Sequence, residues 1–273
     1  MATRTSRPPE TARGRIGRWG LTAFAVAGFV YLFTPIVVIV AYSFNKPKGK
    51  FNIVWQQFTL DNWRDPFASG PLTDAMVLSL KIAVIASVVA TILGTLIALA
   101  LARYRFSGGA LIGLLLVLPI TTPEIVMGSS LATLFIGWEW RRGFATILIA
   151  HILFCTSFVA LTVKARIRGF DWNLEDAAMD LGATPWRTFT RVTLPLITPG
   201  ILAAGLLSFA LSIDDFIITF FNSGSEETFP LRIFGASRTE LSPQINVLAT
   251  VILVGSVAVM LSGVLFRRRH DYR

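Results

Sequence analysis

Long apolar stretches dominate this sequence and limit what it can fold into. They lie at roughly 19–44, 74–102, 110–136, 144–165, 197–222 and 246–266. A helix needs about 20 predominantly apolar residues to cross the hydrocarbon core of a bilayer. The sequence therefore predicts an all-α, polytopic membrane protein with six transmembrane helices.

The composition supports a membrane protein over a soluble one. Only 15% of the 273 residues are charged and 53% are hydrophobic, whereas charged residues make up about a quarter of a typical soluble domain. The net charge of +9 comes from basic residues that flank apolar stretches, so a nucleic-acid partner is not expected. One Cys and two His provide too few ligands to suggest a metal site.

The first apolar stretch is expected to be a retained helix. At about 25 residues it exceeds the roughly 7–15 residues of a signal-peptide core. The basic segment 1–18 before it is predicted to be disordered. The loop 45–73 that follows the first span contains Trp55 and Trp63, and it is expected to carry a short helix on the membrane surface.

The distribution of Lys and Arg predicts the orientation. With the N-terminus inside, sixteen of the 25 basic residues fall in cytosolic segments: the tail 1–18, 103–105, 164–191 and the basic tail 267–273. Cytosolic loops carry an excess of Lys and Arg in membrane proteins. Both termini are therefore predicted to be cytosolic, on either side of one transmembrane domain at 19–266.

The connection at 164–196 is longer than the others and is predicted to be folded. Asn173 is expected to cap a helix beginning near Leu174. Acidic residues in its first turn suit the positive end of the helix dipole, and Gly182 is expected to end the helix.

A second helix is predicted in the same connection. Thr184 and Pro185 are a cap and a first-turn proline in the usual order, and this helix is expected to run to Leu194–Pro195. The segment is therefore predicted to form a helix, a tight turn and a second helix on the cytosolic side of the membrane.

The same segment carries a recognisable pattern. Asp176-Ala177-Ala178 is followed after three residues by Gly182, and after nine more by Val192-Thr193-Leu194-Pro195. This resembles the EAA loop of permeases in the binding-protein-dependent ABC importer family, whose pattern is E-A-A, three residues, G, nine residues, I-x-L-P. Asp176 replaces Glu, although Glu175 beside it can serve instead, and Val192 replaces Ile.

Shorter strings extend the resemblance over nearly the whole chain. They are AYSFN at 41–45, SLKIA at 79–83, LALARY at 99–104, PEIV at 123–126, HILFC at 151–155, SIDDF at 212–216, FPLRI at 229–233, SPQIN at 242–246 and AT at 249–250. No single string is specific. Their order and spacing are similar to those of the second permease subunit of spermidine/putrescine importers.

The resemblance implies a type I ABC importer permease-like bundle in the inner membrane of a bacterium, carrying polyamines into the cytoplasm. The helix-turn-helix at 164–196 would be its cytosolic coupling loop. The residues that would dock into an ATPase subunit are Glu175, Asp176, Ala177, Ala178, Gly182, Leu194 and Pro195. The implied partners are a second, homologous permease, two nucleotide-binding ATPase subunits, an external substrate-binding protein, membrane lipid and the polyamine.

The sequence contains no phosphate-binding loop of the form GxxxxGK[ST]. ATP and magnesium are therefore expected on the partner chains. This chain is expected to have no catalytic residues and no cofactor of its own.

Acidic residues within the predicted spans mark a candidate substrate path. Glu124 falls near the middle of the third span, and Asp214 and Asp215 fall in the outer half of the fifth. A charge at the bilayer centre costs about 2.5–3.5 kcal/mol or more, so such side chains usually face a cavity or a partner. Neighbouring helix residues point about 100° apart, so at most one aspartate is expected to face the path. A structural role for Glu124, beside Pro123, is equally open.

Other interpretations remain. The same importer class could carry iron, a sugar derivative or an organic phosphate. An ion-coupled transporter would have no use for a docking loop, and no inverted repeat is visible. A membrane enzyme is disfavoured because neither HExxH nor GxSxG occurs. The loop helix could also be a surface helix that binds nothing.

Two further spacings in the sequence are explained by ordinary helix packing. His151 and Cys155 share a helix face, which is typical of packing between helices more than of metal binding. Gly109 and Gly113 form a GxxxG spacing that permits close helix contact.

Overall fold

The computed structural model describes residues 12–104 and 106–270. It divides into two compact units, Met1–Pro66 with Glu240–Arg273 and Phe67–Thr239. The regular secondary structure of the described residues is helical, and the β-type pairing among them amounts to two isolated bridges, Asn45–Phe58 and Phe51–Leu241. The all-α prediction is confirmed.

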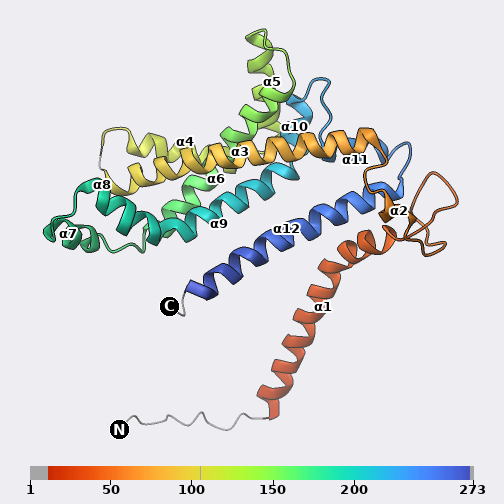
Figure 1. Cartoon of the computed structure of the whole chain (residues 1–273), viewed down its shortest axis with the longest axis horizontal. Coiled ribbons are helices and arrows are strands. Elements are labelled where there is room, and N and C mark those ends of the chain that lie inside the picture. Colours follow the sequence, from red (N-terminus) through yellow and green to blue (C-terminus); the bar gives the residue numbers. More distant parts are fainter. Residues whose placement is uncertain (1–11, 105, 271–273) are drawn as a thin grey trace. The chain divides into compact units, whose positions relative to one another are not determined.

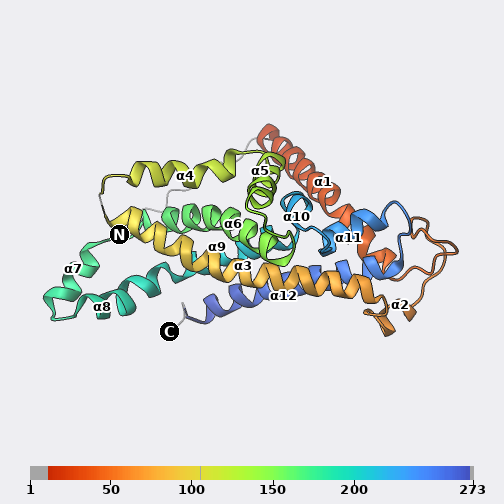
Figure 2. The same ribbon diagram turned by 90° about the horizontal axis from the view of Figure 1, so that it is seen from above.

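The larger unit contains most of the helices. They are α3 (Gly70–Arg103), α4 (Gly109–Thr121), α5 (Glu124–Gly137), α6 (Phe144–Ile167), α7 (Asn173–Asp180), α8 (Pro185–Thr188), a π-helix (Phe189–Thr193), α9 (Leu194–Ile213), α10 (Ile217–Asn222) and α11 (Phe229–Ala236). Helices α3, α6 and α9 pack against one another, with α7 and α8 at one end of this bundle and α11 at the other (Figures 1 and 2).

Small residues allow these three helices to approach closely. A Cβ atom at Gly94 of α3 would lie 2.7 Å from Cγ1 of Val159 on α6. One at Gly205 of α9 would lie 3.0 Å from Oγ1 of Thr91 on α3. Fully buried alanines complete the contact: Ala83, Ala86, Ala90, Ala98, Ala150, Ala160 and Ala204. Close packing of this kind stabilises membrane helices, because lipid gives them no hydrophobic reason to associate.

The predicted GxxxG contact does not form among the described residues. A Cβ at Gly113 would meet nothing within 4 Å, and one at Gly109 would make ordinary contacts at 3.8 Å. The close helix contacts among the described residues use isolated glycines such as Gly94, Gly128 and Gly205, which the GxxxG spacing does not identify.

The smaller unit contains α1 (Ala12–Tyr42), α2 (Asp61–Arg64) and α12 (Pro243–His270), and α1 contacts α12. The connection after α1 is folded around Asn45, whose Nδ2 donates to Asn52 Oδ1 at 2.6 Å and to the Val54 carbonyl at 2.9 Å. None of the most apolar window of α1 is buried within the chain. Its side chains are therefore available to lipid or to another protein.

The predicted short helix in the 45–73 loop exists as α2, a single turn around Trp63. The Trp63 ring stacks on Phe44 with 5.4 Å between centroids, and its Nε1 donates to Ser43 Oγ at 3.1 Å. This turn is tied to the end of α1, and nothing in its contacts places it on a membrane surface.

The predicted count of six spans is confirmed only in part. Within the described residues, four helical segments are individually long and apolar enough to cross a membrane: Trp19–Tyr42, Gly70–Arg103, Phe144–Ile167 and Pro185–Ile213. The bent pair α4 and α5 would make a fifth. The sixth prediction falls on α12, of which Pro243–Ala258 qualifies as a shorter apolar helix.

The third predicted span is not a straight helix. Helices α4 and α5 meet at Thr122–Pro123 with a bend of 110°. Thr122 is extended, with φ −77° and ψ 132°, because a residue before proline is disfavoured in the helical conformation. Glu124 consequently begins a new helix and does not lie in the middle of one.

The fifth predicted span also differs from the structure. Helix α9 ends at Ile213, and after a break at 214–216 the chain resumes as α10. At the other end, the second loop helix continues through the π-helix into α9, so Pro185–Ile213 is one helical segment and does not stop at Leu194–Pro195. Pro195 has no N–H for the preceding turn, and Leu194 N donates to the Phe189 carbonyl in the wider π pattern.

Candidate functional site

The loop between α6 and α9 forms the predicted helix and tight turn. Helix α7 begins at Asn173, but the capping oxygen belongs to Asp171, whose Oδ1 accepts from Asn173 N at 3.1 Å. Gly182 has φ +88° with open space around it, so the left-handed backbone alone demands glycine there. Thr184 Oγ1 accepts from Arg187 N at 3.4 Å and caps α8 as predicted.

The predicted docking residues divide into an exposed set and a buried one. Asp176, Ala177, Gly182 and Pro195 are exposed, and Ala178 and Leu194 are half-buried. Two large apolar side chains that the sequence reading did not single out are the most exposed at this tip: Leu181 at 90% and Trp186 at 74%. An apolar tip of this kind is suited to docking. Glu175 is only 3% exposed.

Glu175 connects the loop to two other elements. Its carboxylate accepts a hydrogen bond from Thr193 Oγ1, at the end of the π-helix, and lies 2.7 Å from Arg103 Nη1, at the end of α3. The Arg103 guanidinium also lies 5.8 Å from the centroid of the Trp172 ring, just before α7. We call Arg103, Glu175 and Thr193 the Glu175 junction.

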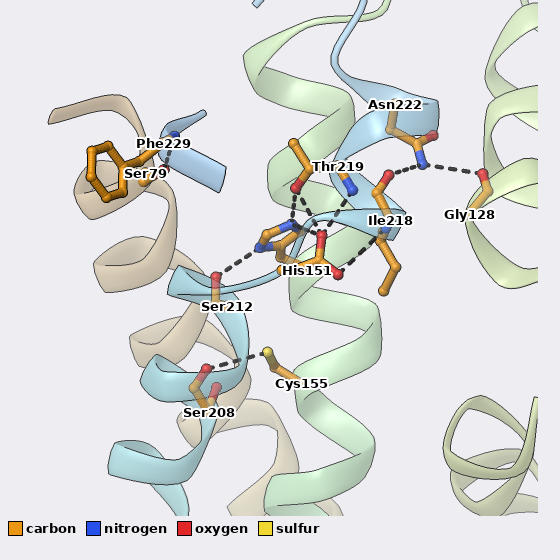
Figure 3. Close-up of polar contacts among 11 residues, drawn as sticks. Ser79, Gly128, His151, Cys155, Ser208, Ser212, Ile218, Thr219, Asn222 and Phe229 are labelled. Carbon is orange, nitrogen blue, oxygen red and sulfur yellow. Dashed lines mark hydrogen bonds and ion pairs between the residues drawn. The ribbon is translucent and has the colours of Figure 1, made fainter. Parts of the chain in front are cut away.

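A second polar cluster lies where α9 breaks into α10 (Figure 3). His151, on α6, is buried between two hydroxyls, with Nδ1 2.7 Å from Ser212 Oγ and Nε2 2.9 Å from Thr219 Oγ1. Its Nε2 is also 3.3 Å from Asp215 Oδ2. Asp215 Oδ2 in turn accepts hydrogen bonds from Thr219 N and Thr219 Oγ1, both at 2.8 Å. This cluster fixes both sides of the break to α6.

The three predicted path carboxylates have different surroundings. The side chain of Asp215 is 5% exposed and belongs to the cluster around His151. Asp214, its neighbour, ends α9 and is exposed. Glu124 is exposed in the first turn of α5. Helices α5 and α10 pack together, and Asn222 Nδ2 donates to the Gly128 carbonyl at 3.2 Å, so Glu124 and the α9–α10 break lie on contacting elements.

Sequence reasoning missed several of these residues. The sequence favours helix packing for His151, and its helix face is buried, with Cys155 0% exposed beside it. The available signal is a histidine inside an otherwise apolar stretch. A buried imidazole needs hydrogen-bond partners for both nitrogens, and Ser212 and Thr219, on either side of the two aspartates, supply them. Arg103 gave no such signal, because an arginine at the end of a predicted span is usually explained by the excess of basic residues on the cytosolic side of membrane proteins.

The apolar helices show an integral membrane protein. The model of the family described as binding-protein-dependent transport system inner membrane component matches residues 90–272. That match includes α6, the loop and both polar sites. The chain belongs to this family.

Named relatives cover most of the chain. It is 40% identical over 241 residues to the putrescine transport system permease protein PotI of Escherichia coli strain K12, covering 85% of each chain. It is 37% identical over 251 residues to the spermidine/putrescine transport system permease protein PotC of Haemophilus influenzae, covering 92% of this chain and 97% of the relative.

Solved structures share the fold. A chain of a bacterial ABC transporter involved in the import of the acidic polysaccharide alginate matches with a TM-score of 0.68 at 15% identity, covering 96% of this chain and 99% of that one. At this identity the likeness concerns the fold alone. It agrees with the predicted importer-permease fold.

Proposed function

We propose that this chain is a translocating subunit of an ATP-driven polyamine importer in a bacterial inner membrane, with both termini in the cytosol. It works with a second permease, two ATPase subunits and an external binding protein. The observation that carries the proposal is the loop: its helix α7 ends at Asp180, Gly182 follows with φ +88°, and Leu181 and Trp186 are exposed. The names of the relatives support polyamines as the cargo.

The docking surface of the loop is its exposed set. Asp176, Ala177 and Gly182 lie beside Leu181, where small side chains permit close approach and the apolar tip enters a cleft of an ATPase subunit. Hydrolysis of ATP, with its magnesium, takes place on those partner chains. This chain itself transmits motion and lines half of the path.

The candidate path residue is Asp214, because the exposed carboxylate at the end of α9 remains available to a cation. The last carbonyl groups of a helix carry partial negative charge, which adds to the attraction for an ammonium group. Asp215 is committed to His151 and Thr219 and acts as an anchor. Glu124, on the contacting helix α5, is a second candidate on the path.

Uptake by cells tests the cargo. Deleting the gene for this chain should abolish uptake of labelled putrescine or spermidine, and a plasmid copy should restore it. Uptake of iron, of a sugar derivative and of an organic phosphate, measured in the same strain, examines the other cargoes. Normal polyamine uptake in the deletion strain, with loss of one of the others, would overturn the polyamine assignment.

A single variant tests the path. Asp214→Asn should lower polyamine uptake by the reconstituted complex while binding-protein-stimulated ATP hydrolysis continues. Asp65→Asn, which neutralises an exposed aspartate in the first loop, is the matched control and should transport normally. Unchanged uptake by Asp214→Asn would show that this carboxylate does not contact the cation.

A further inference from the structure

The Glu175 junction joins three segments that are far apart in the sequence. Arg103 ends α3, Glu175 lies in the first turn of α7, and Thr193 ends the π-helix that leads into α9. The carboxylate is nearly inaccessible, with its side chain 4% exposed, and the Arg103 side chain is 40% exposed. A buried carboxylate is tolerated when it is paired and hydrogen-bonded, and here both conditions are met.

The position of the carboxylate makes the connection stiff. Helix α7 has only eight residues, and an isolated helix of that length is not stable in water. The charge-assisted contact to Arg103 and the hydrogen bond from Thr193 hold its first turn against two long helices. Moving α7 alone would leave the Glu175 charge without partners, which is costly in a buried site.

The π-helix at 189–193 supports a mechanical role. Short π segments inside α-helices are uncommon and often occur at functional sites. This segment places Thr193 where its hydroxyl meets Glu175, and it directly precedes the membrane helix α9. The junction therefore lies between the exposed tip of the loop and the two helices, α3 and α9, that pack against each other in the bundle.

We infer that Glu175 is a positioning residue that makes α7 move together with α3 and α9, so that displacement of the loop reaches the membrane helices. This inference rests on the proposed docking of the loop to an ATPase subunit. Glu175 itself is buried and does not take part in that docking. The exposed residues of the loop make the contact, and the junction passes on the movement.

Transport stoichiometry is the first test. In the reconstituted complex, Glu175→Gln and Thr193→Val should lower the polyamine imported per ATP hydrolysed by about three- to thirtyfold, with ATP hydrolysis retained. Thr193→Ser keeps the hydroxyl and should restore the ratio. Arg64→Met breaks an exposed ion pair with Asp61 in the first loop and should leave the ratio unchanged. A parallel fall of uptake, hydrolysis and assembled complex in Glu175→Gln would show a purely structural role and overturn the inference.

Mobility of α7 gives a readout that does not depend on the cargo. A nitroxide on Asp180→Cys, an exposed position at the end of α7 outside the docking set, in a Cys155→Ala background, should report faster motion when Glu175→Gln or Arg103→Met is added. The two changes together should have little more effect than either alone, because they remove the same contact. Unchanged mobility would refute the junction. A different result would be a wild-type complex that imports no polyamine, in which these variants still increase the mobility of the label. That result would support the junction and refute the proposed cargo.

Discussion

Replacing Asp215 with alanine should destabilise the protein much more than the same change at Asp214. The Asp215 carboxylate accepts hydrogen bonds from Ile218 N at 3.4 Å, Thr219 N at 2.8 Å and Thr219 Oγ1 at 2.8 Å, and it lies 3.3 Å from His151 Nε2. Asp214 makes no side-chain hydrogen bond among the described residues and is exposed. The adjacent positions thus form a matched pair.

The contacts set the size of the effect. The three hydrogen bonds that Asp215 accepts are local and cap the start of α10, and removing a capping side chain costs about 0.5–2 kcal/mol. Leaving the buried polar partner His151 without this contact costs about a further 1–3 kcal/mol. Asp215→Ala should therefore lower the free energy of unfolding by about 2–5 kcal/mol, and Asp214→Ala should change it by no more than about 0.5 kcal/mol.

Thermal unfolding of the purified complex in detergent measures the difference. Asp215→Ala should lower the apparent Tm by at least about 4 °C, and Asp214→Ala should leave it unchanged. Adding His151→Ala to Asp215→Ala should cost less than the two single effects together, because the side chains share one contact. Equal Tm values for the two single alanine variants would refute the anchoring role of Asp215.

Three further outcomes are expected. Gly182→Val forces a β-branched residue to φ +88°, a local cost of about 1–2 kcal/mol, so polyamine uptake per ATP hydrolysed should fall while insertion in the membrane stays normal. Gly94→Leu puts a Cβ atom 2.7 Å from Val159 Cγ1 and should lower the free energy of unfolding, measured in detergent, by about 1–3 kcal/mol. A cysteine placed at the exposed position Ala68 should react with an impermeant thiol reagent from outside, and one placed at the exposed position Arg168 should react only after permeabilisation.

Matched variants control these measurements. Gly169 lies in the same loop without a positive φ, so Gly169→Val should keep the coupling ratio. Gly113→Leu enters open space and should keep stability. Labelling is done in a Cys155→Ala background, and the reverse pattern of reactivity would contradict the proposed orientation. Normal coupling in Gly182→Val would remove the reason for a glycine at the end of α7.

Local rules predicted much of the fold. Apolar length located every long helix, and Gly182 and Thr184 marked the turn and the cap of the loop, because these features depend on the nearest residues alone. Apolar length failed at Pro123 and at Asp214, because the apolar stretch resumes directly after each break and the two parts read as one span. At the first break the backbone turns because of Pro123, and at the second because the Asp215 side chain caps the new helix α10. A hydropathy profile detects neither cause.

The site was predicted less well because burial depends on partners far along the chain. Glu175 and Asp176 are equivalent in sequence, and so are Asp214 and Asp215. Only the approach of Arg103 and Thr193 in one case, and of His151 in the other, buries one member of each pair. The sequence predicts that at most one aspartate faces the path, and it does not say which one is buried.

The unbroken helical segment from Pro185 to Ile213 has a geometric consequence. Its 29 residues span about 43 Å, more than the hydrocarbon core of about 30 Å, so the segment is long enough to place its two ends on opposite sides of the bilayer core and, in the proposed orientation, to act as a lever. A tilt of about 10° around its middle moves each end by about 4 Å in opposite directions, given that length. Pulling the loop end outward therefore pushes the Asp214 end inward. One rigid rod can open one face of the membrane while it closes the other.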